Sequence, residues 1–174
     1  MILNSFKNID RFFKAKSVVF IGGKDIIVPI RELKRRGFKG KIFVVNRKRL
    51  KIENYKCLRK ISDLPLSPDA AFIAVPASEV ISTVKELKAA KCKGIVCYSA
   101  GFKETGKTGK YLEDNLIKEC GDIPLIGPNC YGFINFSDNV ALWPFSHKGA
   151  RCKKGIALIT QSGMLSSDII MATR

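Results

Sequence analysis

The feature that most constrains the fold is a series of short apolar runs separated by segments with helical periodicity. We expect buried strands at residues 17–21, 41–45, 69–75, 94–98, 124–126 and 155–160. Between them, apolar residues recur at the spacing of an amphipathic helix, as in Val80, Val84 and Leu87. Strands that alternate with helices are typical of βαβ units with right-handed crossovers. The sequence therefore predicts an α/β fold with a doubly wound, mostly parallel sheet.

Helices and linkers complete this outline. We expect helices at residues 1–16, 29–36, 78–87, 111–120 and 163–172, and a short helix with loops in the basic stretch 47–66. Residues 145–154 resemble a linker, and the single strand and opening helix after it are too little for a domain. We therefore expect one domain at 1–148, with 149–174 forming a linker and the beginning of a truncated second domain.

Small and turn-forming residues follow most of the expected strands. In an α/β protein these positions lie at the carboxyl edge of the sheet, where ligands bind. Small residues let the backbone approach a ligand, and exposed N–H groups can face phosphate or carbonyl oxygens. The chemistry of the chain is therefore expected along this one edge.

The turns after the first two strands favour a phosphate-bearing ligand. Gly22, Gly23 and Lys24 stand where a phosphate loop would lie, although the same residues also suit a simple strand-to-helix turn. Asn46, Arg47 and Lys48 follow the second strand, where an NAD-binding domain would have an acidic residue. Arg47 can fork onto a phosphate and Lys48 can supply a point charge. This pattern argues against NAD.

The later strands end in similar turns. The remaining candidate ligand-lining residues are Val75, Pro76, Ser99, Ala100, Gly101, Asn129 and Cys130. Ser78 also suits a helix N-cap, which is compatible with an anion site at the same place. Cys130 has no histidine near it in sequence, so we expect it to line a ligand or pack rather than act as a nucleophile. The one histidine, His147, is expected to be an exposed loop residue without a chemical role.

The chain is strongly basic, with a net charge of +16. Basic residues cluster at 34–41 and again at 47–60. Such a field favours an anionic partner, such as a nucleotide, a phosphorylated cofactor, an acidic protein or nucleic acid. A solvated basic face is an equal alternative. The basic stretches lack interleaved aromatic residues, so a platform for single-stranded nucleic acid is not indicated, and nucleic acid is an unlikely partner.

The cysteines and the apolar runs indicate the compartment. Six cysteines contain no C-x-x-C pair, so we expect free thiols, several of them buried, and no metal site. No apolar run approaches the roughly 20 residues of a membrane helix. The first residues lack the apolar core of a signal peptide. These features predict a cytoplasmic protein without a membrane partner.

Several motifs together carry a family resemblance. They are residues 37–40 (GFKG), 45–48 (VNRK), 68–76 (PDAAFIAVP), 99–102 (SAGF), 127–135 (GPNCYGFIN), 141–144 (ALWP) and 159–163 (ITQSG). On these residues the chain resembles the CoA-binding domain of the NDP-forming acyl-CoA synthetase superfamily. That superfamily includes the α subunit of succinyl-CoA synthetase and the ADP-forming acetate–CoA ligases.

The resemblance implies a Rossmann-like domain that binds coenzyme A or acyl-CoA. It implies that the turn residues named above line this site, with Asn129 and Cys130 near the thiol. The parent reaction would be acid, CoA and ATP going to acyl-CoA, ADP and phosphate. Residues 149–174 would lead into the first of the flavodoxin-like domains that follow, and a phosphohistidine and an ATP-grasp module would lie elsewhere. This chain alone is therefore expected to be inactive. The family often assembles into oligomers, so an oligomer is compatible with the sequence.

Two departures from the family pattern leave alternatives open. The first loop is shorter than the usual glycine-rich loop and lacks its Ser or Thr, and Arg47 replaces an expected proline. A non-catalytic nucleotide-binding regulatory module is the first alternative. Part of a CoA-dependent protein acetyltransferase is the second, and a nucleic-acid-binding module driven by charge is a weaker third.

Overall fold

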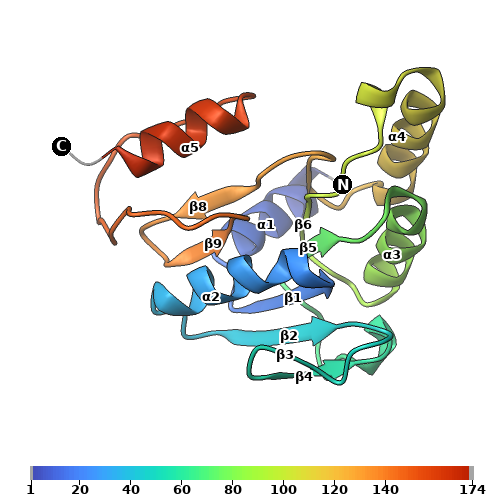
Figure 1. Cartoon of the computed structure of the whole chain (residues 1–174), viewed down its shortest axis with the longest axis horizontal. Helices are drawn as coiled ribbons and strands as arrows, with labels where there is room; N and C mark the ends of the chain where they lie inside the picture. Colours follow the sequence, from blue (N-terminus) through green and yellow to red (C-terminus); the bar gives the residue numbers. More distant parts are fainter. Residues whose placement is uncertain (1, 173–174) are drawn as a thin grey trace.

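The computed structural model describes residues 2–172, which form a seven-stranded sheet with helices on both faces (Figure 1). The strands are β1 (Ser17–Gly22), β2 (Lys41–Val45), β3 (Lys51–Ile52), β4 (Tyr55–Leu58), β5 (Ala70–Ala74), β6 (Ile95–Cys97), β7 (Leu125–Ile126), β8 (Phe133–Asn135) and β9 (Val140–Leu142). The α-helices are α1 (Ile2–Phe13), α2 (Ile27–Arg35), α3 (Ala77–Ala89), α4 (Lys107–Cys120) and α5 (Gly163–Met171). Single 3₁₀ turns are η1 (Lys24–Ile26), η2 (Ile61–Asp63) and η3 (Lys103–Thr105).

The sheet has the strand order of a Rossmann fold. Its order is β3-β4-β2-β1-β5-β6-β7, and every neighbouring pair is parallel except the edge pair β3–β4. Without β3, the six remaining strands follow the 3-2-1-4-5-6 order of doubly wound dinucleotide-binding folds. Strands β8 and β9 form a separate antiparallel hairpin. The predicted α/β Rossmann-like fold is confirmed.

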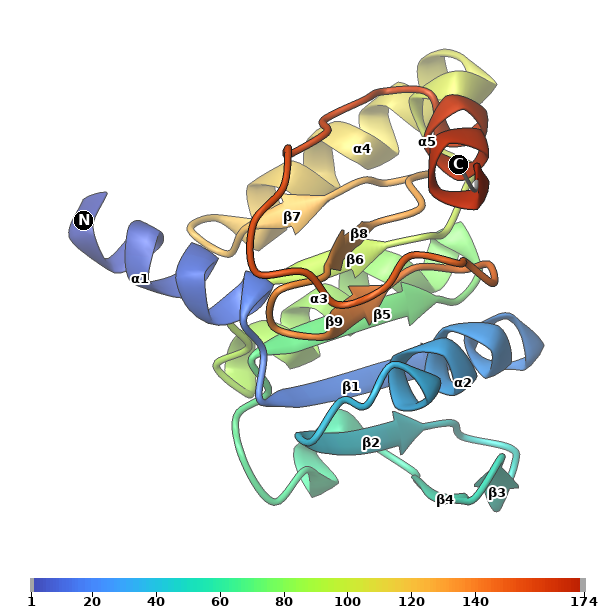
Figure 2. The ribbon, with the colours of Figure 1, turned by 90° about the vertical axis from the view of Figure 1, so that its left-hand side faces the viewer.

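Two apolar layers cover the two faces of the sheet. Figure 2 draws the helices α1, α2, α3 and α4 that supply part of them. On one face, Phe12 of α1, Leu33 of α2 and Leu142 of β9 pack against the sheet in one buried cluster. On the other face, Val84 of α3 and Leu116 of α4 belong to a second cluster. Every residue of β1 is buried, because a central parallel strand is covered on both sides. None of the helices described in residues 2–172 is long and apolar enough to cross a bilayer.

The C-terminal stretch corrects one prediction. Residues 155–160 are apolar but form no strand, and Ile156 and Ile159 are 99% and 96% exposed. A strand needs a neighbour for its backbone N–H and C=O groups, and the described part of the chain places none beside this segment. The following helix, α5, agrees with the predicted 163–172.

Two hairpins were not predicted. The basic stretch 47–66 contains the β3–β4 hairpin and η2 rather than a short helix with loops. Its turn is made at Glu53, whose φ is +52°. The β8–β9 hairpin turns at Asn139, with φ of +55°, and it buries Val140 and Leu142 against the sheet. Both hairpins use asparagine or a charged residue at a positive φ, a weaker signal than glycine.

His147 also differs from its prediction, because it is only 2% exposed. It packs beside the C-terminal end of α2, where the Nη2 atom of Arg36 lies 2.9 Å from its Nδ1. Arg35 and Arg36 also donate to its carbonyl oxygen, at 2.7 and 3.2 Å. Burial and then the nearby Arg36 lower the pKa of His147 to about 4, so the ring is neutral near pH 7.

This burial predicts a pH dependence of stability. The unfolded histidine has a pKa of about 6.5 and the folded one about 4, so acid favours the unfolded chain. The loss begins as the pH falls below about 6.5 and is complete below about 4. Between pH 7.5 and pH 5 the unfolding free energy of the wild type should fall by about 1–2 kcal/mol more than that of His147→Gln. Urea unfolding at both pH values measures this, and parallel losses in the two proteins would contradict it.

Candidate functional site

The carboxyl ends of five adjacent strands bring the predicted turns to one edge. Strands β2, β1, β5, β6 and β7 are successive neighbours, and their arrowheads point to the same side in Figure 2. Asn46-Arg47-Lys48 follow β2, while Gly22 ends β1 and Gly23-Lys24 follow it. The turns after β5, β6 and β7 hold Val75-Pro76, Ser99-Ala100-Gly101 and Asn129-Cys130. From β1 the chain crosses to β2 on one side of β1, and after β4 it returns to β5 on the other side. The turns therefore surround a topological switch point, where open α/β sheets bind ligands.

The backbone is tightest where β1 meets β5. Gly22 has a φ of +154° and pairs with Ala74 in the parallel ladder. A Cβ at Gly22 would lie 2.5 Å from the Ala74 carbonyl oxygen, which is closer than atoms can approach. Gly23, in contrast, has open space where a side chain would extend. Gly23 is the N-cap of η1 and Lys24 is its first residue, and the first N–H groups of a helical turn have no partner within that turn, so they are the ones that can face a ligand.

Asn46 joins the loops that follow β1 and β2. Its Nδ2 donates to the carbonyl oxygen of Gly22 at 2.7 Å. Its Oδ1 accepts from the backbone N–H groups of Lys48 and Arg49, at 2.9 and 2.7 Å. Both ends of the amide are thus used within the protein. Asn46 therefore sets the shape of the cationic loop.

Ser99 has the corresponding role between β5 and β6. Its Oγ donates to the carbonyl oxygen of Val75 at 2.6 Å and accepts from the Val75 N–H at 3.2 Å. The Ser99 carbonyl oxygen accepts from the N–H of Asn129 at 3.0 Å. One buried serine thus holds three of the edge loops together.

Cys130 lies in a constrained turn after β7. Gly127 has a φ of +105°, and its Cβ would lie 2.4 Å from the Cys97 carbonyl oxygen, so only glycine fits. Asn129 has a φ of +52°, which asparagine tolerates better than most residues. The half-buried Cys130 follows, and its Sγ accepts from the N–H of Gly132 at 3.4 Å. The turn presents one thiol at the end of the edge.

An aromatic wall beside Cys130 was not predicted. The Tyr131 ring lies 6.4 Å from that of Tyr98 and 4.8 Å from that of Phe145. Gly163, the first residue of α5, packs so closely on Tyr131 that a Cβ there would lie 2.4 Å from the ring. The wall depends on segments far apart in the sequence. Its one local signal is Tyr131, which directly follows Cys130 in the GPNC motif.

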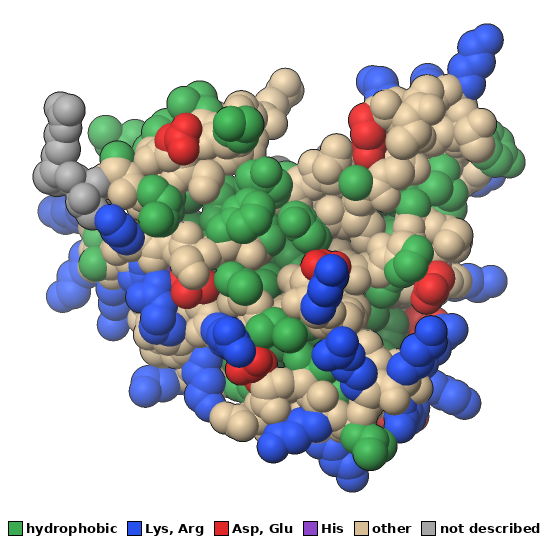
Figure 3. Space-filling view, viewed as in Figure 1, with side chains coloured by type: hydrophobic (Ala, Val, Ile, Leu, Met, Phe, Trp, Pro, Cys, Tyr) green, Lys and Arg blue, Asp and Glu red, His purple; other side chains and the backbone are tan. Residues whose placement is uncertain are grey.

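Cations surround the end of the edge that lies opposite to Cys130, beside β1 and β2. Lys24, Arg47 and Lys48 are exposed, and lysine and arginine side chains crowd the lower part of the face in Figure 3, over β2, β3 and β4. Arg47 forms an exposed ion pair with Glu86 of α3 at 3.3 Å, so its guanidinium is turned toward that helix. Lys51 and Lys56 lie directly opposite each other in the β3–β4 hairpin, an unfavourable pairing of like charges.

Four of the other five cysteines are buried, and Cys152 is exposed. Cys57, Cys92, Cys97 and Cys120 are buried and unpaired, which confirms the expectation of free, largely buried thiols. Burial raises the pKa of Cys92 and of Cys97 to about 12, so both stay protonated and unreactive. Within residues 2–172, no three His, Cys, Asp or Glu side chains come together in a way that would hold a metal ion.

Five loops gathered over a switch point define an α/β domain of the nucleotide- and cofactor-binding Rossmann class. The family model described as "CoA binding domain" matches residues 28–135, more than half of the chain. The chain therefore belongs to this family of CoA-binding domains. The match includes the edge loops after β2, β5, β6 and β7, and it begins after the shortened first loop.

Named relatives agree with this assignment. The chain is 30% identical to the α subunit of acetate–CoA ligase [ADP-forming] II of Pyrococcus furiosus, over 95% of this chain and 37% of that protein. It is 32% identical to a trans-feruloyl-CoA synthase of an unknown prokaryote, over 97% of this chain and 25% of that protein. The solved dinucleotide-forming acetyl-coenzyme A synthetase 1 of Ca. Korarchaeum cryptofilum, in complex with phosphate and ADP, matches with a TM-score of 0.80 and 27% identity, over 93% of this chain and 36% of that one.

These relatives confirm the resemblance to NDP-forming acyl-CoA synthetases. The chain spans only about a quarter to somewhat over a third of the length of the relatives it matches. The match is thus to one part of each of these larger proteins.

Proposed function

We propose that this domain binds coenzyme A or its thioester along the carboxyl edge of the sheet. The observation that carries the proposal is the convergence of five loops at one switch point, with cations at one end and a thiol at the other. The family match supports the same ligand. CoA combines a phosphorylated nucleotide with a long arm that ends in a thiol, so it needs a site of this kind.

The residues at the edge fit such a ligand. The N–H groups of Gly23 and Lys24 and the side chains of Lys24 and Lys48 would meet the phosphates. Arg47 would join them after leaving Glu86, and exposed ion pairs of this type are weak. Val75, Pro76, Ala100 and Gly101 would line the arm. Asn129 and Cys130 would lie near the thiol, with Tyr131 as an apolar wall.

Gly22, Asn46 and Ser99 would act by positioning these loops. Gly22 permits the close approach of β1 to β5, while the side chains of Asn46 and Ser99 are hydrogen-bonded to neighbouring loops. Their substitution should therefore change CoA affinity through the shape of the edge.

The parent protein would be an ADP-forming acyl-CoA synthetase, in which ATP-grasp and phosphohistidine modules make the acyl donor. We propose that residues 1–148 are its CoA-binding domain and that 149–174 lead into the next domain. The large exposed apolar side chains of residues 156–171 support this second part, because such surface is usually covered by a partner. The isolated chain would not complete the ligase reaction. The unpaired cysteines fit a reducing, cytoplasmic compartment.

Calorimetric titration of the chain with CoA at two salt concentrations tests the proposal, with NAD as the control ligand. We expect saturable binding of CoA, weakened moderately by salt, and no saturable binding of NAD. Absence of CoA binding at both salt concentrations would contradict the proposal.

Charge reversal at Lys48 tests where CoA binds. Lys48→Glu places a carboxylate among the proposed phosphate contacts, and charge-assisted hydrogen bonds contribute about 1.5–3 kcal/mol each. We expect CoA to bind at least tenfold more weakly to this variant. Lys118→Glu makes the same charge change at an exposed position of α4, and its CoA affinity should stay within twofold of that of the wild type. Equal affinities of the two variants in the same titration would argue against a phosphate site at Lys48.

A further inference from the structure

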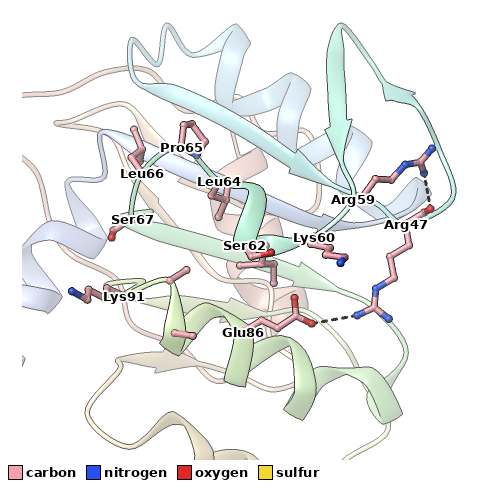
Figure 4. A pocket seen from close by; sticks show the side chains of 13 residues that line it. Arg47, Arg59, Lys60, Ser62, Leu64, Pro65, Leu66, Ser67, Glu86 and Lys91 are labelled. Carbon is pink, nitrogen blue, oxygen red and sulfur yellow. Dashed lines mark hydrogen bonds and ion pairs between the residues drawn. The ribbon is translucent and has the colours of Figure 1, made fainter.

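A cavity lies on the α3 face of the sheet, next to the proposed CoA edge. The connection from β4 to β5, residues 59–69, contains only the single turn η2, although parallel strands are usually joined through an α-helix. The space beside α3 is therefore only partly covered. A cavity of about 980 Å³ remains there, between residues 59–67 and the last turns of α3 (Figure 4).

The cavity has an apolar floor. The side chains that form it are Ile61, Leu64, Pro65, Leu66, Ala89 and Ala90. Ile61 is buried in the core cluster of this face, and Leu64 packs against the same cluster, so the floor is fixed in place. Ser62 and Ser67 add hydroxyl groups. An apolar floor with a few polar groups is the usual lining of a small-molecule site, and the volume is that of a pocket for a drug-sized ligand.

The rim of the cavity is cationic. Arg47, Arg59 and Lys60 lie together at one end and Lys91 at the other, as Figure 4 shows. Glu86 is the one carboxylate of the lining, and it is already paired with Arg47 at 3.3 Å. Arg59 is held in place because its Nη1 donates to the carbonyl oxygen of Arg47 at 2.6 Å. Three cations at one end exceed the charge of a single carboxylate and match a phosphate group.

We propose that this cavity is a second ligand site, which takes a phosphorylated nucleoside. The phosphate lies at the Arg59–Lys60 end, and the base lies on the floor beside Leu64, Ala89 and Ala90. The site goes beyond the proposed CoA function. Arg47 borders both sites, because it follows β2 at the edge and its side chain reaches α3. A nucleotide bound here would therefore change the cationic loop of the CoA edge.

Titration of the full chain with ADP, adenosine and inorganic phosphate tests the proposal. We expect saturable ADP binding, with adenosine at least tenfold weaker. Lys60→Glu should weaken ADP binding at least tenfold, and Ala89→Phe should abolish it by filling the cavity from an exposed position. Lys85→Glu makes the same charge change on α3 outside the cavity and should stay within twofold. Circular dichroism confirms that each variant is folded.

Titration with CoA separates this site from the strand edge. Lys60→Glu and Ala89→Phe should keep the CoA affinity of the wild type within twofold. ADP binding that is absent, or that neither variant changes, would overturn the proposal. A parallel loss of ADP and CoA binding in both variants would also overturn it, because the cavity would then hold the nucleotide end of CoA itself.

Discussion

Gly22→Ala should lower the unfolding free energy by about 2–3 kcal/mol, a large effect for the addition of one methyl group. The new Cβ would lie 2.5 Å from the Ala74 carbonyl oxygen and 3.0 Å from Cγ2 of Ile26. The carbonyl belongs to a central strand and cannot move without separating β5 from β1. The φ of +154° at Gly22 adds strain for any other residue. Urea unfolding followed by the fluorescence of the single, buried Trp143 measures the loss.

Gly23→Ala is the matched control for this prediction. A Cβ at Gly23 meets nothing within 4 Å, so its unfolding free energy should change by less than about 0.5 kcal/mol. CoA titration of Gly22→Ala should also show a loss of affinity of tenfold or more, because the switch point between β1 and β5 widens. Equal stabilities of the two alanine variants would show that the approach of Gly22 to Ala74 is not restrictive.

The sheet and its functional edge were predictable because they depend on local patterns. A continuous apolar run such as 17–21 marks a strand that is covered on both faces. Once strands and helices alternate, the carboxyl ends of the parallel strands share one edge. The positions of Gly22, Asn46 and Ser99 along that edge then follow from the order of the chain alone.

The sequence did not predict which segments are buried by contacts with other parts of the fold. Residues 155–160 have the apolar content of a strand, but Ile156 and Ile159 are almost fully exposed, because no neighbouring strand is present among the described residues. His147 shows the opposite error. It follows a hairpin that folds back over α2, so a polar loop residue becomes buried. Both outcomes depend on contacts that periodicity does not contain.

The partners of the edge side chains were also beyond the sequence. Asn46 is hydrogen-bonded to Gly22 and Ser99 to Val75, each 24 positions away along the chain. Turn-forming residues indicated that these loops matter. Only the fold shows that the side chains join loops to each other, while neighbouring cations and N–H groups are available to a ligand.

Asp69 holds β1 and β5 together at their amino ends, opposite to the edge where Gly22 lies. The sequence placed Asp69 at the start of a strand and assigned it no role. Asp69 is 6% exposed, and its Oδ2 accepts from the N–H groups of Lys16 and Ser17 at 3.0 and 3.1 Å. The same oxygen accepts from Oγ of Ser17 at 3.0 Å, and Oδ1 accepts from Nε of Arg11 at 2.9 Å. One carboxylate thus fixes α1, the start of β1 and the start of β5.

Asp69→Ala should therefore lower the unfolding free energy by about 2–4 kcal/mol, because the buried N–H and hydroxyl of Ser17 lose their acceptor. Asp69→Asn keeps one acceptor oxygen in place and should lose about half as much. Asp122→Ala removes an exposed carboxylate and should change stability by less than about 0.5 kcal/mol. Urea unfolding ranks the three variants, and a loss in Asp69→Ala no larger than that in Asp122→Ala would refute this role. Asp69 acts at the amino end of the strands, away from the proposed CoA edge. Asp69→Ala and Asp69→Asn should therefore still bind CoA under conditions in which they are folded, unlike Gly22→Ala.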